Sequence, residues 1–207
     1  MQYRDARRVA VLHHAAMGSS LWAKLGTRFL RELYRGLIED ERFLGFVYEE
    51  DGQIEGFIAG STDASEMMGA VFKKRLVPLG VSASLGVVRR PSVVLKLLQT
   101  AQYFAASDDS ELHIPAESLF CSFTPKLRGK RVSGHINKVL FDDLAARGHS
   151  HVKITTEIDN EGANRQLTSW GFEERGHFTF YGKDMVLYAL DLGASERVTP
   201  RLSHPTI

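Results

Sequence analysis

A strand, a basic turn and a helix follow one another around the central stretch Phe123-Thr124-Pro125-Lys126-Leu127-Arg128-Gly129-Lys130-Arg131-Val132-Ser133-Gly134. The apolar run 119–123 reads as a strand, and apolar residues from Val132 to Leu144 recur at helical spacing. A helix that begins after such a turn offers free backbone N–H groups and the positive end of its dipole. The pattern predicts a cradle for a phosphate-bearing cofactor. An ordinary strand-to-helix turn with a solvated basic rim is the alternative.

Two other phosphate-binding motifs are excluded at this turn. A P-loop needs Gly-Lys-Ser/Thr after a four-residue spacing, and the chain does not have it. A Rossmann arrangement needs a carboxylate about twenty residues farther on, in the matching place, and this is also missing.

A second segment, residues 151–172, repeats the order of strand, turn and helix. Residues 151–158 alternate and are β-branched, which is typical of a strand. A short helix, 161–170, then follows between Asn160 and Gly171, with Ala163 in its first turn and Phe172 after its end. Asn160 suits a helix N-cap and Gly171 a helix C-cap, so local capping is one explanation for both residues.

Both segments resemble motifs of the GNAT superfamily of N-acetyltransferases. The acetyl-CoA signature of that family runs apolar-x-Pro-x-x-Arg/Gln-Gly-x-Gly-x-Gly/Ala between a strand and a helix. The residues that match it are Phe123, Pro125, Arg128 and Gly129. Arg131 stands where the family usually has its second Gly, Ser133 stands where it has Gly or Ala, and Gly134 follows one place late. In the second segment, the spacing of Asn160, Ala163, Gly171 and Phe172 also matches the family.

The resemblance covers roughly residues 1–192 and implies a fold and a donor. The fold is α/β, with a mixed, mostly antiparallel central sheet flanked by helices and a long helical insert between strands three and four. The donor is acetyl-CoA. The cofactor-binding residues that the resemblance implies are Phe123, Thr124, Arg128, Gly129, Lys130, Arg131, Val132, Ser133, Gly134 and Asn160.

Acetyl transfer needs a base for the attacking amine and hydrogen-bond donors for the thioester oxygen. Glu117 begins the strand 117–123, in a place similar to that of the general base in the histone-acetylating branch of the family. Glu157 and Asp159, at the end of the adjacent strand, are the second choices. Backbone amides near Phe123 are expected to face the thioester carbonyl. The alternative for Glu117 is a solvated carboxylate at a strand end.

The general acid has no clear counterpart in the sequence. Many relatives have a Tyr four residues before the helix-closing Gly, and Leu167 stands there. Tyr181, on the final hairpin, is the substitute, and a core or rim tyrosine is the alternative reading. Direct attack with water returning the proton needs no Tyr. A lone Cys121 on a strand is expected to be a small apolar residue rather than an acyl-carrying nucleophile.

One domain is expected over residues 1–192. The spacing predicts helices at 6–17, 21–38, 92–106, 131–147 and 161–170, and strands at 43–48, 54–59, 117–123, 151–158, 173–181 and 185–192. Residues 62–115 form the insert, which we expect to cover the acceptor side; a structural embellishment or a homodimer contact is the alternative. The polar tail 193–207 contains two prolines and is expected to be disordered.

Composition limits the partners and the compartment. The net charge of +1 gives no bulk attraction for nucleic acid. A single cysteine excludes an internal disulfide and fits a reducing, cytoplasmic compartment. No signal peptide and no apolar run of membrane-spanning length is visible. The eight histidines lack metal-ligand spacing, so no metal is expected, and adjacent His13 and His14 read as surface residues.

The sequence therefore predicts an acetyl-CoA-dependent N-acetyltransferase that acts by direct transfer to a primary amine. The insert favours a bulky acceptor such as a nucleotide-linked amino sugar, with another small amine or a protein amine as alternatives. A non-catalytic acyl-CoA-binding module is the alternative from a different class.

Overall fold

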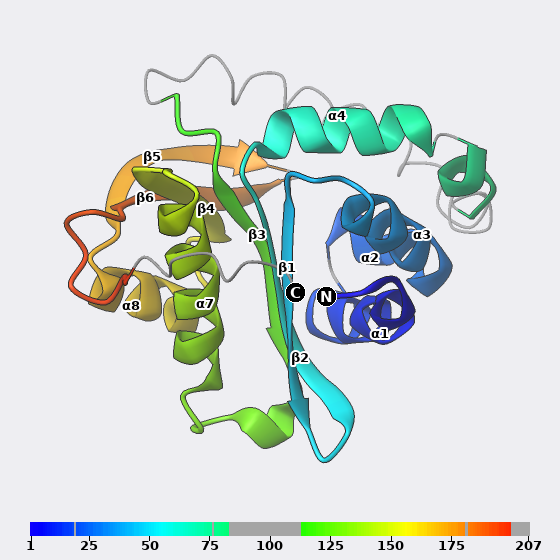
Figure 1. Ribbon diagram of the computed structural model, residues 1–207, viewed down its shortest axis with the longest axis horizontal. Helices are drawn as coiled ribbons and strands as arrows, with labels where there is room; N and C mark the ends of the chain where they lie inside the picture. Colours follow the sequence, from blue (N-terminus) through cyan, green and yellow to red (C-terminus); the bar gives the residue numbers. More distant parts are fainter. Residues whose placement is uncertain (19, 76, 83–112, 181, 200–207) are drawn as a thin grey trace.

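The computed structural model describes residues 1–18, 20–75, 77–82, 113–180 and 182–199. Within these ranges a six-stranded sheet carries helices on both faces (Figure 1). The strands are β1 (Phe43–Glu50), β2 (Gln53–Ser61), β3 (Glu117–Phe123), β4 (His151–Glu157), β5 (Glu173–Phe180) and β6 (Lys183–Asp191). The helices are α1 (Ala6–Ala16), α2 (Leu21–Lys24), α3 (Thr27–Ile38), α4 (Ala64–Lys74), α7 (Val132–Ala146) and α8 (Glu161–Trp170), with short 3-10 turns η1 (Tyr3–Asp5) and η2 (Pro125–Leu127).

The strands lie in the order β1-β2-β3-β4-β6-β5. Every neighbouring pair is antiparallel except β3 and β4, which run parallel. The prediction of a mixed, mostly antiparallel sheet flanked by helices is thereby confirmed. In Figure 1, β5 and β6 run at a steep angle to β1, β2 and β3, so the two halves of the sheet turn away from each other.

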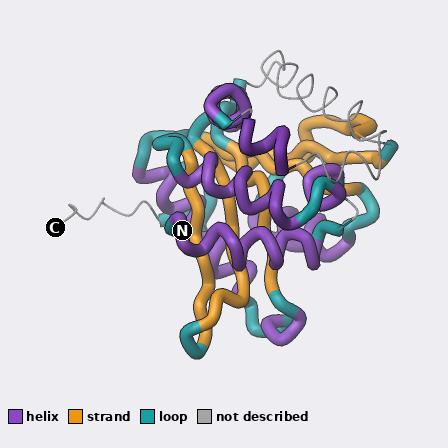
Figure 2. Tube along the Cα trace, turned by 90° about the vertical axis from the view of Figure 1, so that its right-hand side faces the viewer, coloured by secondary structure: helices purple, strands orange, loops and turns teal. Residues whose placement is uncertain are grey.

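Two apolar cores lie on the two faces of the sheet. Helices α1, α2, α3 and α4 cover one face, where Leu30, Leu33 and Phe57 are fully buried. These helices lie in front of the strands in Figure 2. Helices α7 and α8 cover the other face, where Leu140 and Phe141 meet Val152 of β4. Alternation along each strand therefore sends successive side chains to opposite cores.

The helix predicted at 21–38 is two helices in the structure. Gly26 separates α2 from α3 and has a φ of +93°, a conformation that interrupts a right-handed helix. Ser20 caps α2 by accepting a hydrogen bond from the Ala23 N–H at 3.3 Å. Both helices bury apolar residues in the same core, so the apolar spacing of the sequence does not reveal the break.

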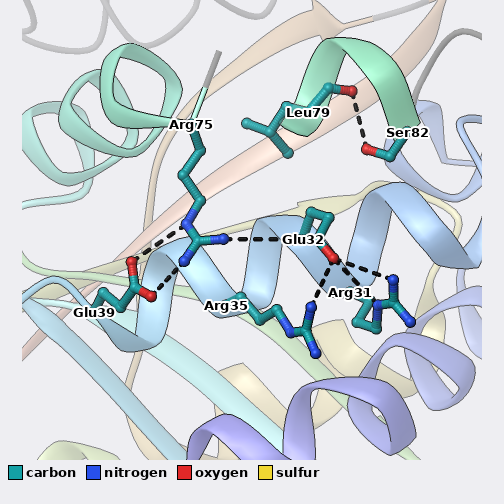
Figure 3. Close-up of polar contacts among 7 residues, drawn as sticks. All are labelled: Arg31, Glu32, Arg35, Glu39, Arg75, Leu79 and Ser82. Atoms are coloured by element: carbon teal, nitrogen blue, oxygen red, sulfur yellow. Dashed lines mark hydrogen bonds and ion pairs between the residues drawn. The ribbon is translucent and has the colours of Figure 1, made fainter. Parts of the chain in front are cut away.

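The described part of the insert begins with α4, which is tied to α3 by ion pairs (Figure 3). Arg75, after the last turn of α4, binds the carboxylate of Glu39 and lies 3.4 Å from Glu32. Arg35 also pairs with Glu32, at 2.9 Å. These contacts fix where the insert leaves the core. The helix predicted at 92–106 lies outside the described residues, and the acceptor-side role of the insert stays a prediction.

Residues 193–199 pack against α7 and α8, so the disorder predicted from Gly193 does not hold for this part of the tail. The Thr199 N–H donates to the buried Asp142 carboxylate at 2.8 Å. The Arg197 guanidinium lies 5.4 Å from the centre of the Trp170 ring, and Val198 is buried. The polar composition of the tail conceals these partners because they come from distant helices. Residues 200–207 lie outside the described residues.

His13 is fully buried, so the prediction of a surface residue is wrong for this histidine. It faces the sheet from the last turn of α1 and packs between Tyr34, Phe57 and Phe120. His14, one position on, is exposed. Adjacent residues on a helix point in different directions, and only the packing of α1 decided which of the two is buried. Within the described residues there is no cluster of metal-ligating side chains.

Candidate active site

The parallel strands β3 and β4 pair over two positions only and then diverge. Glu117 pairs with Lys153 and Ser118 with Ile154, after which no further pairs form. On its other edge, β3 stays paired with β2 as far as Phe123. The divergence leaves one edge of β3 without a neighbouring strand from Leu119 to Phe123. Such an opening exposes backbone N–H and C=O groups that a ligand can bind.

A β-bulge lies where the two strands separate. Ala59 of β2 pairs with Phe120, but Gly60 pairs with Ser118, so Leu119 is an extra residue in β3. A bulge bends its strand and increases the local twist. The bend follows directly after the last pair between β3 and β4. It accounts for the turn of β3 away from β4.

The backbone of Phe123 faces this opening. The Thr124 N–H donates to the Glu55 carbonyl of β2 at 2.8 Å. Because backbone groups alternate along a strand, the Phe123 N–H points to the opposite edge, where β4 has diverged. Cys121, which pairs with Ile58 in the same way, turns its N–H to the same open edge, so either amide can bind the carbonyl oxygen of an acyl donor.

The turn between β3 and α7 has two residues with positive φ. Gly129 has a φ of +81°, which glycine adopts freely. Arg131 has a φ of +58° and precedes the first residue of α7, in the left-handed region that other residues avoid. The structure thus imposes a glycine-like conformation at the position where the family motif has its second Gly.

The N-terminus of α7 has no side-chain cap. The first turn of an α-helix leaves its backbone N–H groups without intrahelical partners, here those of Val132, Ser133 and Gly134. The Ser133 hydroxyl donates to Gln166 of α8 at 3.1 Å. Its backbone N–H is therefore the group that Ser133 offers to an anion, beside the positive end of the helix dipole.

A pocket of about 330 Å³ opens at this helix terminus. Its walls contain most of the residues predicted to bind the cofactor, and Pro125 and Leu127 complete them. The lining residues are Phe123, Thr124, Pro125, Leu127, Arg128, Gly129, Arg131, Val132 and Ser133. Uncapped helix amides, two arginines and an adjoining strand edge fit a donor that carries a diphosphate at a distance from its acyl group, as acetyl-CoA does.

The four basic residues of the turn have different partners. Lys126 pairs with Glu55 at 2.7 Å and with Glu50 at 3.3 Å, and Lys130 pairs with Glu50 at 3.1 Å. Hydrogen bonds from Lys130 and then Lys126 lower the pKa of Glu50. Arg128 and Arg131 line the pocket instead. The lysines hold the turn against the β1–β2 hairpin, which lies at the lower edge of Figure 1, and the arginines face the pocket.

Three predicted cofactor residues do not line this pocket. Lys130 binds Glu50, and Gly134 lies within the first turn of α7. Asn160 caps α8, where its side-chain oxygen accepts a hydrogen bond from the Ala163 N–H at 3.3 Å. The capping alternative for Asn160 is thus realised in the structure. Gly134 contributes only through its backbone N–H.

Glu117, the first choice for the base, is buried at the paired end of β3. It is 4% exposed, and its Oε2 atom has no hydrogen-bond partner. Burial raises the pKa of Glu117 to about 7, and the nearby Lys153 opposes that rise. A carboxylate with a pKa near neutrality and a free acceptor atom suits general-base chemistry.

The other catalytic candidates are less favourably placed. Glu157, at the far end of β4, is bound by Lys183 and is about one-third exposed. Leu167 is buried in the core beneath α8. Tyr181 lies outside the described residues, so its role as an acid stays a prediction.

Cys121 lies on β3 with its thiol turned towards α7. Burial raises the pKa of Cys121 to about 12, and a hydrogen bond with Asn137 opposes the rise only in part. A thiol with so high a pKa has almost no thiolate at neutral pH. The reading of Cys121 as a small apolar residue fits this environment.

Three charged residues near the site were not identified from the sequence. Glu50 and Glu55 hold the basic turn, and Lys153 lies beside Glu117. Glu50 and Glu55 flank the Asp-Gly hairpin, so their charges read as ordinary solvated positions. Lys153 is a charged residue within an alternating strand, and a charge at such a position indicates that the side chain has a partner of opposite charge.

Comparison with known proteins agrees with this architecture. No protein-family model matches the sequence. A curated relative, mycothiol acetyltransferase of Brachybacterium faecium, is 30% identical over 89 residues. The match takes in 43% of this chain and 23% of that protein, so the chain corresponds to less than a quarter of its relative's length.

Two solved structures share the fold over almost the whole chain. An N-acetyltransferase from Staphylococcus aureus Mu50 has a TM-score of 0.59 and 16% identity, covering 93% of this chain and 95% of that one. An acetyltransferase of the GNAT family from Bacillus cereus ATCC 10987 has a TM-score of 0.54 and 11% identity, covering 92% and 93%. At these identities the likeness concerns the fold.

Proposed function

We propose that this chain, which has the fold of the GNAT acetyltransferases, transfers the acetyl group of acetyl-CoA directly to a primary amine. One observation carries the proposal. The opening between β3 and β4 leads from the uncapped N-terminus of α7 to the buried carboxylate of Glu117. Glu117 and Phe123 are at opposite ends of β3, roughly 20 Å apart at the rise of an extended strand, so an elongated donor can place its diphosphate at α7 and its thioester towards Glu117.

The residues of the pocket have distinct parts in donor binding. Arg128 and Arg131 supply positive charge, and the first-turn N–H groups of α7 supply directed hydrogen bonds for phosphate oxygens. The donor brings an acyl group activated as a thioester. The Cys121 and Phe123 N–H groups both face the open edge of β3, and the Cys121 N–H, which is nearer to Glu117, donates to the acyl oxygen as negative charge develops there.

Glu117 accepts a proton from the attacking amine. Amines are protonated at neutral pH, so a base must remove a proton before nitrogen can attack. The free Oε2 atom and a pKa of about 7 suit Glu117 to this step. Water returns a proton to the departing thiolate in the simplest form of this reaction. Tyr181 stays a candidate for that role.

For the acceptor we propose a small primary amine, and a nucleotide-linked amino sugar is the first member of this class to test. The motifs and the fold support an acetyl transfer, and the curated relative is itself described as an acetyltransferase. Among the described residues, no helix is long and apolar enough to cross a membrane. A cytoplasmic location and a homodimer stay predictions.

The test combines calorimetry with a turnover assay on the full chain. Acetyl-CoA should bind saturably, and Arg128→Glu should abolish binding because it reverses a charge in the pocket. A panel of amines that begins with amino sugars should release free CoA thiol. Glu117→Gln should bind acetyl-CoA as tightly as the wild type and lower kcat by roughly 10²–10⁴-fold.

Glu157→Gln is the matched comparison because Glu157 is the competing base. It should lower kcat much less than Glu117→Gln, since Lys183 already neutralises its charge. Saturable binding without turnover of any amine would instead support the non-catalytic acyl-CoA-binding module. An absence of acetyl-CoA binding by the wild type would overturn both functions.

A further inference from the structure

Glu117 and Lys153 form the first of the two pairs that join β3 to β4. They are direct partners in the parallel register, so their side chains leave the sheet on the same face. Val152 and Ile154, on either side of Lys153, pack into the core beneath α7 and α8. Alternation therefore places Lys153 and Glu117 on the opposite face, beside the start of the opening.

This pair is buried but not hydrogen-bonded. The side chains of Glu117 and Lys153 are 5% and 11% exposed, and 4.0 Å separates Oε2 from Nζ. That distance is too long for a hydrogen bond, and Oε2 has no other partner. It is short enough for a strong charge interaction in a buried site.

Lys153 is the charged neighbour of Glu117 among the described residues. On β2 the residue paired with Glu117 is Ser61, which is neutral and whose hydroxyl accepts a hydrogen bond from the Asp63 N–H. On β4 the facing residue is Lys153, and it alone acts electrostatically on the carboxyl of Glu117 against the effect of burial.

The geometry matters because a base must keep one lone pair available. A lysine hydrogen-bonded to Oε2 would favour the ionised carboxylate but would also occupy the atom that receives the proton. A lysine 4.0 Å away supplies the charge and leaves the atom free. Without any cation, a fully buried carboxyl stays protonated at neutral pH.

We propose that Lys153 is a positioning residue for the transfer reaction: its ammonium group favours the ionised form of Glu117 and leaves Oε2 free to accept the proton of the amine. This inference rests on the proposed role of Glu117 as the base. It concerns a residue of β4 that has no contact with the pocket at the N-terminus of α7.

The direct test follows the carboxyl group itself and does not depend on turnover. Protein labelled with ¹³C at the glutamate side-chain carboxyl is titrated by NMR, and the Glu117 signal is identified by its loss in Glu117→Gln. Lys153→Met should raise the pKa of Glu117 by roughly one to three units, the usual effect of an opposite charge at this distance. Lys153→Arg should keep the wild-type value to within roughly half a unit, because it keeps the charge.

Turnover supplies the second readout. The acid limb of the pH profile of kcat/KM should move upward in Lys153→Met by the same number of units as the NMR titration. The affinity for acetyl-CoA should not change. Lys183→Met is the matched control, since it removes a lysine beside Glu157 on the neighbouring strand. A shift in Lys183→Met but not in Lys153→Met would overturn the inference and would assign the limb to Glu157.

The outcomes separate this inference from the proposed function. If the NMR pKa rises but no amine is acetylated, the charge coupling stands and the enzymatic function fails. If amines are acetylated and neither the NMR pKa nor the acid limb moves in Lys153→Met, Lys153 is not a positioning residue. Lys153→Gln repeats the test with a polar neutral side chain in case the methionine variant does not fold.

Discussion

The Nδ1 atom of His13 and the hydroxyl of Tyr34 lie 2.8 Å apart between α1 and α3, and neither side chain exposes any surface. The other ring nitrogen, Nε2, has no hydrogen-bond partner. Burial, and secondarily the charge of His14, lower the pKa of His13 to about 4. An imidazolium at this place would have no anionic partner, so His13 is neutral in the folded protein over most of the pH range.

His13 should therefore make the protein more stable as pH rises from about 4 to 6.5. In this window the unfolded chain binds a proton at His13 and the folded chain does not, so the free energy of unfolding increases with pH. His13→Phe should remove this increase, which amounts to roughly 3 kcal/mol for a pKa lowered from 6.5 to about 4. Urea unfolding at a series of pH values measures it.

His14→Phe is the control for this experiment, because His14 is exposed. It should leave the slope with pH unchanged. The loss of the Tyr34 hydrogen bond in His13→Phe adds a constant cost of roughly 1–3 kcal/mol at every pH and does not alter the slope. An unchanged slope in His13→Phe would contradict the prediction.

Glu117 should produce the opposite dependence on pH. Its folded-state pKa of about 7 lies above the ordinary value of 4.5, so the folded protein holds a proton that the unfolded chain has lost. The free energy of unfolding should fall between these pH values by roughly 3 kcal/mol. Glu117→Gln should remove the fall, and its stability relative to the wild type should grow with pH.

The double variant His13→Phe/Glu117→Gln gives a further check on both assignments. Because the two slopes oppose each other over the shared window, the wild type should show little net change there. The double variant should also be nearly flat, while each single variant slopes in its own direction. Two single variants with slopes of the same sign would show that one assignment is wrong.

Arg131→Gly should raise stability even though it removes a residue of the proposed donor site. Arg131 has a φ of +58°, which costs a residue with a Cβ roughly 1–2 kcal/mol relative to glycine. Part of that gain is lost to the greater flexibility of glycine in the unfolded chain. The net result should be an increase of about 0.5–1 kcal/mol in the free energy of unfolding.

Arg128→Gly is the matched comparison for Arg131→Gly. Arg128 lines the same pocket, but its φ is −58°, which needs no glycine. It should lower the free energy of unfolding by about 0.5–1 kcal/mol. Both variants should weaken acetyl-CoA binding in calorimetry because each removes a cation. Equal changes in stability would show that the backbone of Arg131 is not strained.

Asp142→Asn should destabilise the protein through the contact between α7 and the tail. Asp142 is 1% exposed and accepts hydrogen bonds from the Lys138 ammonium group at 2.9 Å and from the Thr199 N–H at 2.8 Å. The substitution replaces one acceptor oxygen with an NH₂ group, which is a hydrogen-bond donor and would face the donors of Lys138 and Thr199. We expect a loss of about 2 kcal/mol in chemical denaturation.

Asp143→Asn provides the control one residue along α7. Asp143 pairs with Arg147 on the exposed side of the helix, 2.9 Å away. Exposed ion pairs of this kind contribute little to stability, so the free energy of unfolding should fall by less than about 0.5 kcal/mol. Similar losses in the two variants would mean that the buried contact with the tail does not contribute to stability.

The sequence predicts which residues form the pocket at the start of α7 because they are close together in the chain. A strand, a turn with Gly129 and an uncapped helix start lie within a dozen consecutive residues, and the pocket forms from those same residues. The errors arise where distant segments meet. Lys130 is bound by Glu50 from another hairpin, and residues 193–199 find partners on α7 and α8. Local composition contains no information about either contact.

The sequence by itself determined the order of the strands and most of the helices, the position of the basic turn before α7 and the identity of Glu117 as a candidate base. These depend on periodicity, on turn residues and on short motifs, each of which acts over a few neighbouring residues. The tertiary structure decided what surrounds each of these groups. It buried His13 rather than His14, and it placed Lys153 opposite Glu117 through a parallel register between residues 36 positions apart. Charge and burial depend on such long-range contacts, and they give Glu117 a pKa of about 7 where an exposed glutamate would have an ordinary one.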